Sequence, residues 1–360
     1  MWFRSVFALW RSGCTAPRSS QPARSRGPRL FVEQLEDRTL PSSYTAASVS
    51  DLIADINAAN QVGGSNTIAL VAGTTFSLTA VNNTTDGATG LPIIAANDNL
   101  TILGNGDTIA RSTAKGTPAF RLFDVAVGAS LTLQNLTAQN GLAPEILTPQ
   151  NFYAAQGGAM NNHGALILDG VIVQNSSVSS SQFAEGGGIY SSGALTLEGG
   201  TTVQNNVAVG AAGDTNTGGG RALGGGVYVA GGTALLSNVS LASNTAQGGN
   251  GGQGTPVCSM GYCRPGIGGP GGNGLGGALY VAGGTVSLTG ARVEANSALG
   301  GHGGNAPGGT KGPDGLGEGG GLYIDALATV GLDAFTVANV LRNKASASDN
   351  DIYGSYTLLP

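Results

Sequence analysis

A short segment that opens with two or three glycines recurs along this chain, and it restricts the possible folds more than any other feature. It reads GGGIYSSGALTLEGGTTVQNNVA at 186–208 and returns at 224–246 and 276–298, with looser copies beginning at Gly157 and Gly319. Each copy, about 22 residues long, contains three short runs of alternating apolar residues separated by small or polar turns. Such a repeat is typical of a solenoid, in which each coil packs only on its neighbours.

The composition agrees with a solenoid of strands. Charged residues make up 10% of the 360 residues and 63 residues are glycine, whereas soluble domains average about 25% charged residues and about 7% glycine. A chain rich in Thr, Val, Leu, Asn and Gly favours stacked strands and tight turns over helices. We therefore predict an all-β parallel β-helix of about eight coils over residues 44–360, with regular repeats at about 157–354.

One helix is predicted before the strands, at about residues 48–60. The apolar residues that share one of its faces are Val49, Leu52, Ile53 and Ile56. Ser48 or Ser50 can cap its N-terminus, and Gly63 follows its end. We expect this helix to cover the open N-terminal end of the solenoid, which would otherwise expose an apolar edge.

The first 43 residues differ from the rest of the chain. They contain seven arginines and three acidic residues, and their Pro/Arg/Ser-rich centre cannot bury a core, so residues 1–43 are predicted to be disordered. A short motif within them consists of Leu35, Glu36, Asp37, Arg38 and Pro41. It resembles the LEPR/LEDR-type motif near the start of many large planctomycete surface and exported proteins. The resemblance implies an export or sorting segment; the alternative is a plain charged linker.

The strand-forming part also resembles known proteins. The succession DLIADINAAN, NTIAL, LTILGNGDTI and LTLQNLTAQNG resembles the opening of many bacterial right-handed parallel β-helix surface proteins. The openings GGAM, GGGI, GGGV, GGAL and GGGL, with VQNN, LASN and VEAN downstream, resemble the middle repeats of the polymorphic outer membrane protein family. This second resemblance covers roughly residues 90–354. Together they imply a right-handed, pectin-lyase-like β-helix exposed at a cell surface.

An aromatic column is predicted on the outside of the coils. The fourth residue of each copy is apolar, in the order Met160, Ile189, Val227, Leu279 and Leu322. The fifth is tyrosine in four copies, Tyr190, Tyr228, Tyr280 and Tyr323. Because side chains alternate between the faces of a strand, inward fourth residues direct the tyrosines outward, about 4.8 Å apart. The column can contact glycans or another surface, or it can stabilise itself by stacking beneath the insertions.

A second column is predicted where each coil ends. It would contain Asn175, Asn205, Asn244 and Asn296, with Asn339 as a looser last member. Stacked Asn side chains can form hydrogen bonds along the solenoid axis and with turn backbone groups. We interpret this column as structural.

Glycine-rich insertions of increasing length follow the ends of the coils, so they should emerge on one edge of the solenoid. Their glycine content favours flexible or loosely packed structure. The longest contains Cys258 and Cys263, which could form a local disulfide in an oxidising compartment; the alternative is a pair of free thiols. No further Cys or His lies near them in the sequence to complete a metal site.

An enzyme of this fold would need polar side chains that converge on one cleft. Glycoside hydrolysis uses paired carboxylates, and lyase chemistry would use carboxylates that hold a cation together with a basic residue. The coils offer Asp169, Glu198 and Glu294, and we expect no acid to repeat at one position in adjacent coils. His163 lies in a predicted turn without an evident Ser or Cys nucleophile, and His302 lies in an insertion.

The sequence predicts no cofactor and no bound metal. GLGEGG at 315–320 lacks the strand–helix context of a dinucleotide site, and Asp214, Asp314 and Glu318 are isolated acids. Residues 44–360 hold nine basic and eighteen acidic residues, which disfavours nucleic acid and anionic membrane surfaces as partners. No run of about 20 apolar residues marks a transmembrane helix.

These observations favour a non-enzymatic structural or adhesive protein that is secreted or held at the cell surface or outer membrane. Its partners would be cell-surface glycans or other surface proteins. One alternative is a polysaccharide-acting β-helix enzyme, either a lyase or a hydrolase. The other is a glycan-binding module that uses the tyrosine column.

Overall fold

The computed structural model describes residues 41–360, apart from 148–152 and 260–261. The predicted export segment and its LEDR-type motif lie outside the described residues, except for the last three positions of the segment. Of these, Ser42 and Ser43 belong to the first strand, β1 (Ser42–Ala46), because pairing with β2 (Gly64–Leu70) satisfies their backbone groups. Within the described part, no helix is long and apolar enough to cross a membrane.

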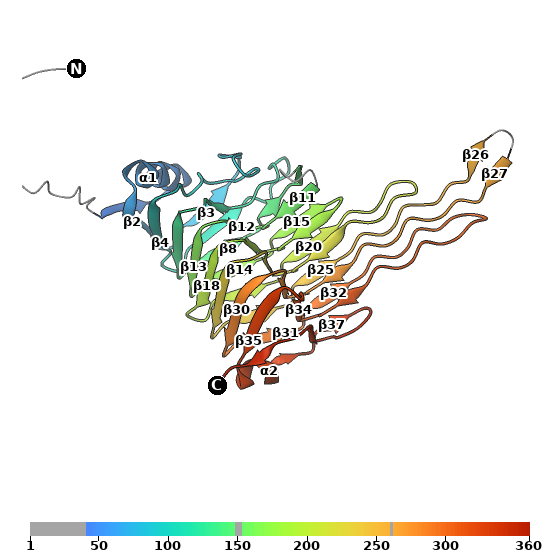
Figure 1. Ribbon diagram of the computed structural model, residues 1–360. Coiled ribbons are helices and arrows are strands. Elements are labelled where there is room, and N and C mark those ends of the chain that lie inside the picture. The colour runs from blue at the N-terminus through green and yellow to red at the C-terminus, as the bar shows by residue number, and fades with distance from the viewer. Residues whose placement is uncertain (1–40, 148–152, 260–261) are drawn as a thin grey trace, which may run out of the picture. The chain divides into compact units, whose positions relative to one another are not determined.

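Three sheets form the body of the fold, and successive coils contribute neighbouring parallel strands to each of them (Figure 1). The ten-stranded sheet consists of β1, β2, β4 (Asp98–Leu103), β7 (Ser130–Gln134), β13 (Ala165–Asp169), β18 (Ala194–Glu198), β23 (Thr233–Ser237), β30 (Gly284–Thr289), β35 (Ala328–Leu332) and β39 (Thr357–Leu358). The eight-stranded sheet consists of β3 (Thr75–Leu78), β5 (Thr108–Arg111), β8 (Thr137–Gln139), β14 (Ile172–Gln174), β19 (Thr202–Gln204), β24 (Ser240–Ala242), β31 (Arg292–Glu294) and β36 (Val340–Leu341). The seven-stranded sheet consists of β6 (Phe123–Val125), β12 (Met160–Asn162), β17 (Ile189–Ser191), β22 (Val227–Val229), β29 (Leu279–Val281), β34 (Leu322–Ile324) and β38 (Ile352–Tyr353).

Two further sheets carry the chain away from the body and back to it, and we call them the outgoing and returning sheets. The outgoing sheet consists of β9 (Leu142–Ala143), β15 (Ser177–Ser180), β20 (Val207–Gly210), β25 (Thr245–Gln247), β32 (Ser297–Leu299) and β37 (Lys344–Ala345). The returning sheet consists of β10 (Ile146–Leu147), β11 (Tyr153–Gln156), β16 (Phe183–Glu185), β21 (Arg221–Leu223), β28 (Gly274–Leu275) and β33 (Gly317–Glu318), and only β10 is antiparallel to its neighbour. This all-β arrangement of stacked parallel strands confirms the coarse fold class predicted from the repeat.

Each regular coil visits the five sheets in the same order. The coil that begins at β17 continues through β18, β19 and β20 before β21 brings it back. A glycine turn then starts the next coil, and its first residue, Gly224, has a φ of 67° that favours glycine. The glycine pair therefore makes the sharp turn between a returning strand and the next coil.

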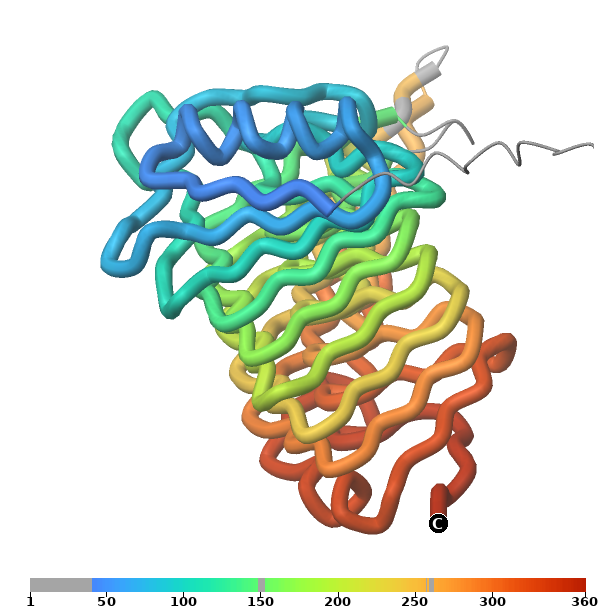
Figure 2. The backbone as a smooth tube through the Cα atoms, turned by 90° about the vertical axis from the view of Figure 1, so that its left-hand side faces the viewer, coloured from blue at the N-terminus to red at the C-terminus, as the bar shows by residue number. Residues whose placement is uncertain are grey.

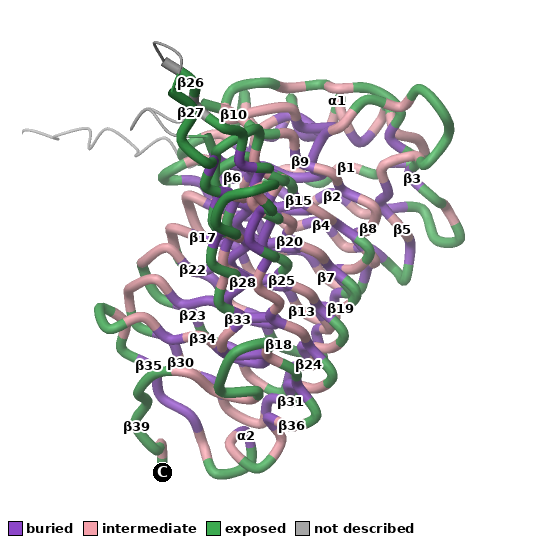
Figure 3. The backbone as a smooth tube through the Cα atoms, turned by 90° about the vertical axis from the view of Figure 1, so that its right-hand side faces the viewer, coloured by how far each residue is buried: buried purple, intermediate pink, exposed green. Residues whose placement is uncertain are grey.

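Apolar residues fill the body in columns that follow the strand register. On the ten-stranded sheet, Leu168 pairs with Leu133 on one side and with Leu197 on the other, and all three are fully buried. On the seven-stranded sheet, the predicted inward residues Met160, Ile189, Val227, Leu279 and Leu322 are at most 1% exposed. Figure 3 shows this alternation of buried and more exposed positions along the strands. Each such side chain contributes roughly 1.5–3 kcal/mol to stability through burial, so the core is built coil by coil.

Helix α1 (Val49–Val62) lies across the N-terminal end of the stack (Figure 2). The Ser48 hydroxyl accepts a hydrogen bond from the Asp51 N–H at 3.2 Å, and Gly63 ends the helix. Leu52, Ile56 and Ala59 are fully buried in the same core cluster as the strands. The predicted capping helix is therefore present and extends two residues past its predicted end. Helix α2 (Ala334–Ala338), which was not predicted, begins after its N-cap, Asp333.

The buried asparagine column is present, but it uses a different register from the predicted one. Its members are Asn206, Asn244, Asn296 and Asn343, and each is at most 7% exposed. Asn175 and Asn205 instead adopt positive φ and lie exposed in the turn, while Asn339 caps the C-terminus of α2. The prediction was wrong at Asn175 and Asn205 because the residue after the Val-Gln pair turns the chain and the next one, Ser176 or Asn206, enters the coil. It was wrong at Asn339 because α2 ends there and Asn343 takes the buried position.

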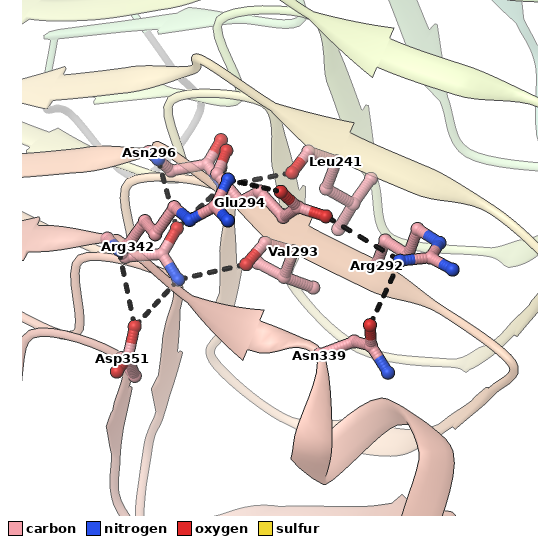
Figure 4. A network of polar contacts seen from close by, with 9 residues as sticks. Leu241, Arg292, Val293, Glu294, Asn296, Asn339, Arg342 and Asp351 are labelled. Atoms are coloured by element: carbon pink, nitrogen blue, oxygen red, sulfur yellow. Dashed lines mark hydrogen bonds and ion pairs between the residues drawn. The ribbon is translucent and has the colours of Figure 1, made fainter.

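The column joins successive coils through both backbone and side-chain bonds. The Oδ1 of Asn244 accepts from the backbone N–H of Asn206 at 3.0 Å and from its Nδ2 at 3.1 Å. The Nδ2 of Asn244 donates to the carbonyl of Val203 at 2.9 Å and to Asn296 Oδ1 at 3.1 Å. Figure 4 shows the following step, where Asn296 donates to the Leu241 carbonyl. Buried polar groups are thus paired along the axis.

In their described residues the glycine-rich insertions form regular, hydrogen-bonded segments, and together with the outgoing and returning sheets they form what we call the blade. It projects from the body in Figure 1, and the hairpin of β26 (Val257–Ser259) and β27 (Tyr262–Arg264) lies at its far end. Small side chains pack between the two sheets at its base: Ala143, Ala155, Val178, Ala184, Ala208, Ala222 and Ala246. This order is a correction to the flexible structure that the glycine content predicted.

Hydrogen bonds at every third residue hold the blade together. In one outgoing segment, Gly248, Gly251 and Gly254 all donate to carbonyls of the next coil at 2.8 Å. The residues that follow two of them, Gly249 and Gly252, donate across the blade to its returning segments at 2.9 Å. A repeat of three is that of a polyproline II chain, which has no internal hydrogen bonds and can bond only to its neighbours.

Glycine is required in the outgoing and returning segments because their backbones lie so close to one another. A Cβ added to Gly251 would overlap the carbonyl oxygen of Gly269 in the other layer, and one added to Gly249 would overlap that of Ala211 in the neighbouring coil. The absence of side chains therefore creates the blade, since only glycine lets the two layers form hydrogen bonds across such a short gap.

Candidate functional site

The strand register brings the four predicted tyrosines into one column. Tyr190, Tyr228, Tyr280 and Tyr323 are successive partners on the seven-stranded sheet, and Tyr353 on β38 is a fifth member. Sequence reasoning missed Tyr353 because no glycine pair precedes its strand. The available signal was the apolar–tyrosine pair Ile352–Tyr353, which matches the pair in the other copies.

The five rings stack nearly parallel. Their centroids are 5.4, 5.2, 4.8 and 4.5 Å apart along the column, and the angles between neighbouring ring planes are 4–9°. Each inner ring therefore has an aromatic neighbour on both of its faces. Tyr190, Tyr228 and Tyr280 are only 8% exposed, because Leu223 and Leu275 of the returning sheet pack against them. These three rings have no free face on which another flat molecule could stack.

The hydroxyl groups of the buried rings also have partners. Tyr190 is hydrogen-bonded to Gln156, Tyr228 to Glu185, and Tyr280 to Asp325. Burial, with nearby carboxylates, raises the pKa of Tyr190 to about 12 and raises those of Tyr228 and Tyr280 further. These phenols stay protonated at any physiological pH; Tyr228 and Tyr280 donate to their carboxylates, and the Tyr190 oxygen accepts from the Gln156 amide.

Glu185, which sequence reasoning did not single out, lies buried beside the tyrosine column. Its Oε2 accepts from Gln156 Nε2 at 2.9 Å, and it is hydrogen-bonded to Tyr228. Burial raises its pKa to about 7, against the two hydrogen bonds that lower it. A carboxyl group poised near neutrality is a common feature of catalytic sites, but here both of its partners belong to the fold.

Polar residues continue the column toward the N-terminal end of the stack. Asn161 pairs with Tyr190 on one side and with Asp124 on the other. The Asn161 Nδ2 lies 3.1 Å from Asp124 Oδ1 and 3.0 Å from His163 Nε2. Burial raises the pKa of Asp124 to about 6, while the charge of the fully buried Arg121 lowers it. The cluster thus buries one cation and one carboxyl group together.

His163 has a hydroxyl neighbour that its sequence context did not reveal. Its Nδ1 lies 2.8 Å from the Oγ of Ser192, which occupies the same turn in the next coil. With Nε2 accepting from the Asn161 amide, Nδ1 carries the proton and donates it to Ser192. Burial lowers the pKa of His163, which keeps the ring neutral. In this arrangement the imidazole takes no proton from Ser192 and does not activate it as a nucleophile.

The acids of the body are placed differently from one another. Asp169 and Glu198 are direct register partners on β13 and β18. The expectation that no acid repeats in adjacent coils was therefore wrong, because the coil lengths align two turns that differ in sequence. Gln134 Nε2 lies 3.3 Å from Asp169 Oδ2, and Glu198 is exposed. This is the one position among the three candidate acids where two carboxyl groups meet on neighbouring strands.

Glu294 faces arginines instead of another acid. Its carboxylate lies 3.8 Å from Arg292 Nη1 and 3.7 Å from Arg342 Nη1, and all three side chains are at least 30% exposed (Figure 4). Exposed ion pairs of this kind contribute little to stability.

The blade contains the remaining predicted residues. Cys258 and Cys263 are opposite each other in the hairpin and form a disulfide. His302 is exposed in an outgoing segment, where its backbone N–H donates to Asn250 Oδ1 at 2.9 Å. Asp314 accepts from Lys311 Nζ at 2.7 Å, and Asp214 is exposed. Over the described part of the chain, no three His, Cys, Asp or Glu side chains are grouped closely enough to hold a metal ion.

A groove of about 480 Å³ lies where the tyrosine column is least buried. It is lined by Tyr323, Ile324, Asp325, Ala326, Ala328, Tyr353, Gly354 and Ser355. Tyr323 and Tyr353 are both partly exposed, unlike the three rings before them. Of the predicted contact residues, Tyr323 is thus the one that reaches a groove.

Comparisons with known proteins give no relative from which a function could be inferred. No protein-family model, no curated protein and no solved structure matches the chain.

Proposed function

We propose that this protein is a non-enzymatic, extracytoplasmic structural or adhesive surface protein built on a right-handed, pectin-lyase-like β-helix. The main evidence for this proposal is the structure of the blade. Its segments are tied to one another by hydrogen bonds at every third residue, and the blade projects from the body with a hairpin at its far end (Figure 1). A rigid projection that presents a small tip is suited to contact with another surface.

The side chains that recur from coil to coil support a structural role. The asparagine column bonds each coil to the next, and the inner tyrosines stack on each other beneath leucines. Their repetition is accounted for by contacts within the fold. Variable surface contacts would then come from the insertions, which differ from coil to coil.

The hairpin supports a location outside the cytoplasm. The disulfide between Cys258 and Cys263, which are both exposed, closes a short loop. Such bonds persist in oxidising compartments and are rare where thiols are kept reduced. The LEDR-type motif at Leu35–Arg38 points to the same compartment by resemblance.

Cell fractionation with protease treatment of intact cells tests the proposal. We expect the protein in the envelope or medium and accessible to protease, with Cys258 and Cys263 oxidised. A protein that stays in the cytoplasm, protected and reduced, would contradict the proposal. A control cytoplasmic enzyme in the same cells reports on lysis.

The paired acids favour a polysaccharide hydrolase as a second candidate. Neighbouring strands lie about 4.8 Å apart, and retaining glycosidases use carboxyl groups about 5–5.5 Å apart, so side chains at the register-paired positions Asp169 and Glu198 can reach that separation. If purified protein releases reducing ends from polysaccharides and Glu198→Gln abolishes this activity, the non-enzymatic proposal fails. Exchange of the exposed, arginine-paired Glu294 to Gln is the matched control.

A further inference from the structure

The groove beside Tyr323 and Tyr353 combines an apolar surface with unsatisfied polar groups. The two rings are stacked 4.5 Å apart, and the aliphatic side chains that line the groove beside them are Ala326 and Ala328. Among the described residues no aromatic ring stacks on the second face of Tyr353. A groove of about 480 Å³ falls within the usual size range of small-molecule sites, roughly 300–1,000 Å³.

Three polar groups of the groove can still form hydrogen bonds. The hydroxyl of Tyr353 lies beside that of Tyr323, and the pair together has at least one hydroxyl proton that no other described side chain accepts. Asp325 Oδ1 accepts from the Leu327 N–H at 3.2 Å, and the carboxylate also accepts from the Tyr280 hydroxyl, so acceptor capacity remains. The Ser355 hydroxyl is exposed at the edge. The groove thus presents a donor, a carboxylate acceptor and a hydroxyl beside an aromatic surface.

This combination matches the chemistry of a sugar ring. A pyranose has an apolar C–H face that packs on an aromatic ring, and adjacent hydroxyls that donate to a carboxylate and accept from a phenol. The charges near the groove come from Asp325 and Glu318, which both act on Tyr323, and no Lys, Arg or His lines it. Acidic sugars would therefore be repelled.

We propose that the groove lined by Tyr323, Asp325, Tyr353 and Ser355 binds one pyranose ring of a neutral glycan. The site lies on the body at the turn that follows the seven-stranded sheet, and it is separate from the hairpin of the blade. It does not rest on the proposed adhesive role. A protein that binds sugar here but stays in the cytoplasm would contradict only the localisation.

Saturation-transfer NMR and calorimetry with a defined set of oligosaccharides test the proposal. The probes are neutral hexasaccharides of β-1,4-glucan, β-1,4-xylan, β-1,4-mannan and β-1,3-glucan, with an oligogalacturonate as the acidic comparison. We expect at least one neutral probe to bind with a dissociation constant on the order of 1 mM or tighter, and the acidic probe to bind more weakly. No binding of any neutral probe at about 5 mM, or tighter binding of the acidic probe, would overturn the proposal.

Variants locate the binding. Tyr353→Phe removes one hydroxyl and should weaken binding by about three- to tenfold, the factor that one ordinary hydrogen bond supplies. Ser355→Tyr fills the groove from an exposed turn position and should weaken binding by more than tenfold while the coils stay folded, which circular dichroism checks. Tyr356→Phe is the control, because Tyr356 is 39% exposed and does not line the groove. If both groove variants bind as the unmodified protein does, the sugar lies elsewhere and the proposal fails.

Discussion

Substitution of one buried asparagine tests whether the column holds the coils together. In Asn244→Ala the fold loses four hydrogen bonds, two accepted from Asn206 and two donated to Val203 and Asn296. Two of these partners keep another hydrogen bond in the variant. Asn206 Nδ2 keeps its bond to the Val173 carbonyl at 3.0 Å, and Asn296 Oδ1 keeps the backbone N–H of residue 244 at 2.9 Å.

The backbone N–H of Asn206 loses its partner, whereas the Val203 carbonyl keeps the N–H of Ala242 in the parallel ladder between β19 and β24. Each buried group left without a partner costs about 1–3 kcal/mol. The expected loss in the free energy of unfolding is therefore about 1–3 kcal/mol, to which the small cavity adds. A loss of this size follows when a substitution leaves one buried polar group without a partner.

The neighbouring Asn205→Ala is a matched control. Asn205 is the same residue type, is exposed and has a φ of 54°. Its replacement should cost about 1 kcal/mol, from the weaker preference of alanine for left-handed backbone. Urea unfolding followed by far-ultraviolet circular dichroism measures both losses, and hydrogen exchange of residues 203–206 shows whether the orphaned N–H opens locally. Equal losses in the two variants would refute the view that the column, and not the turn, holds the coils in register.

Three further substitutions probe other parts of the fold. Gly249→Ala should increase hydrogen exchange throughout the glycine segments of the blade, because its Cβ would overlap the Ala211 carbonyl of the neighbouring outgoing segment, whereas Gly231→Ala, which meets nothing within 4 Å, should not. Glu185 has a pKa raised by burial from 4.5 to about 7, so its contribution to stability is complete below pH 4.5 and is lost as the pH rises to about 7; Glu185→Gln should remove this loss and raise the free energy of unfolding by about 3 kcal/mol near pH 8, measured by urea titration. Ala295→Asn should raise the melting temperature by a few degrees, because residue 295 is exposed with a φ of 56° that asparagine tolerates better.

The inward-facing columns could be predicted from the sequence because a period of two leaves little choice of face. Ile189 and Val227 each precede a tyrosine, and one of each pair must point inward. Once the apolar residue is assigned to the core, the tyrosine column follows. The depth to which that column is covered could not be predicted, because Leu223 and Leu275 come from returning strands whose position depends on the insertions.

The asparagine column shows where pattern alone is ambiguous. In VQNN, Asn205 and Asn206 are equally polar, and both roles suit asparagine. In the following coils the turning position is Ser243 and then Ala295, which have φ values of 56°, so a side chain with no preference for that conformation takes it. Aligning the copies on the buried asparagines Asn206, Asn244 and Asn296, and not on the residues that turn the chain, would have given the correct register.

The blade shows that glycine content and glycine spacing carry different information. Content alone predicts a flexible chain, since glycine gains the most freedom in the unfolded state. Spacing predicts the opposite here. In GGX triplets, one glycine N–H bonds to the next coil and the other bonds across the blade, as Gly251 and Gly252 do. The third residue points outward, so its N–H needs a separate partner unless the residue is proline, which has none. Pro313 occupies one such position, and at another the N–H of Leu316 donates to Asn273 Oδ1 at 3.0 Å. Because all three backbone positions are accounted for, a period of three in glycine, with Pro or Asn at the third position, is a signal of packed extended chains.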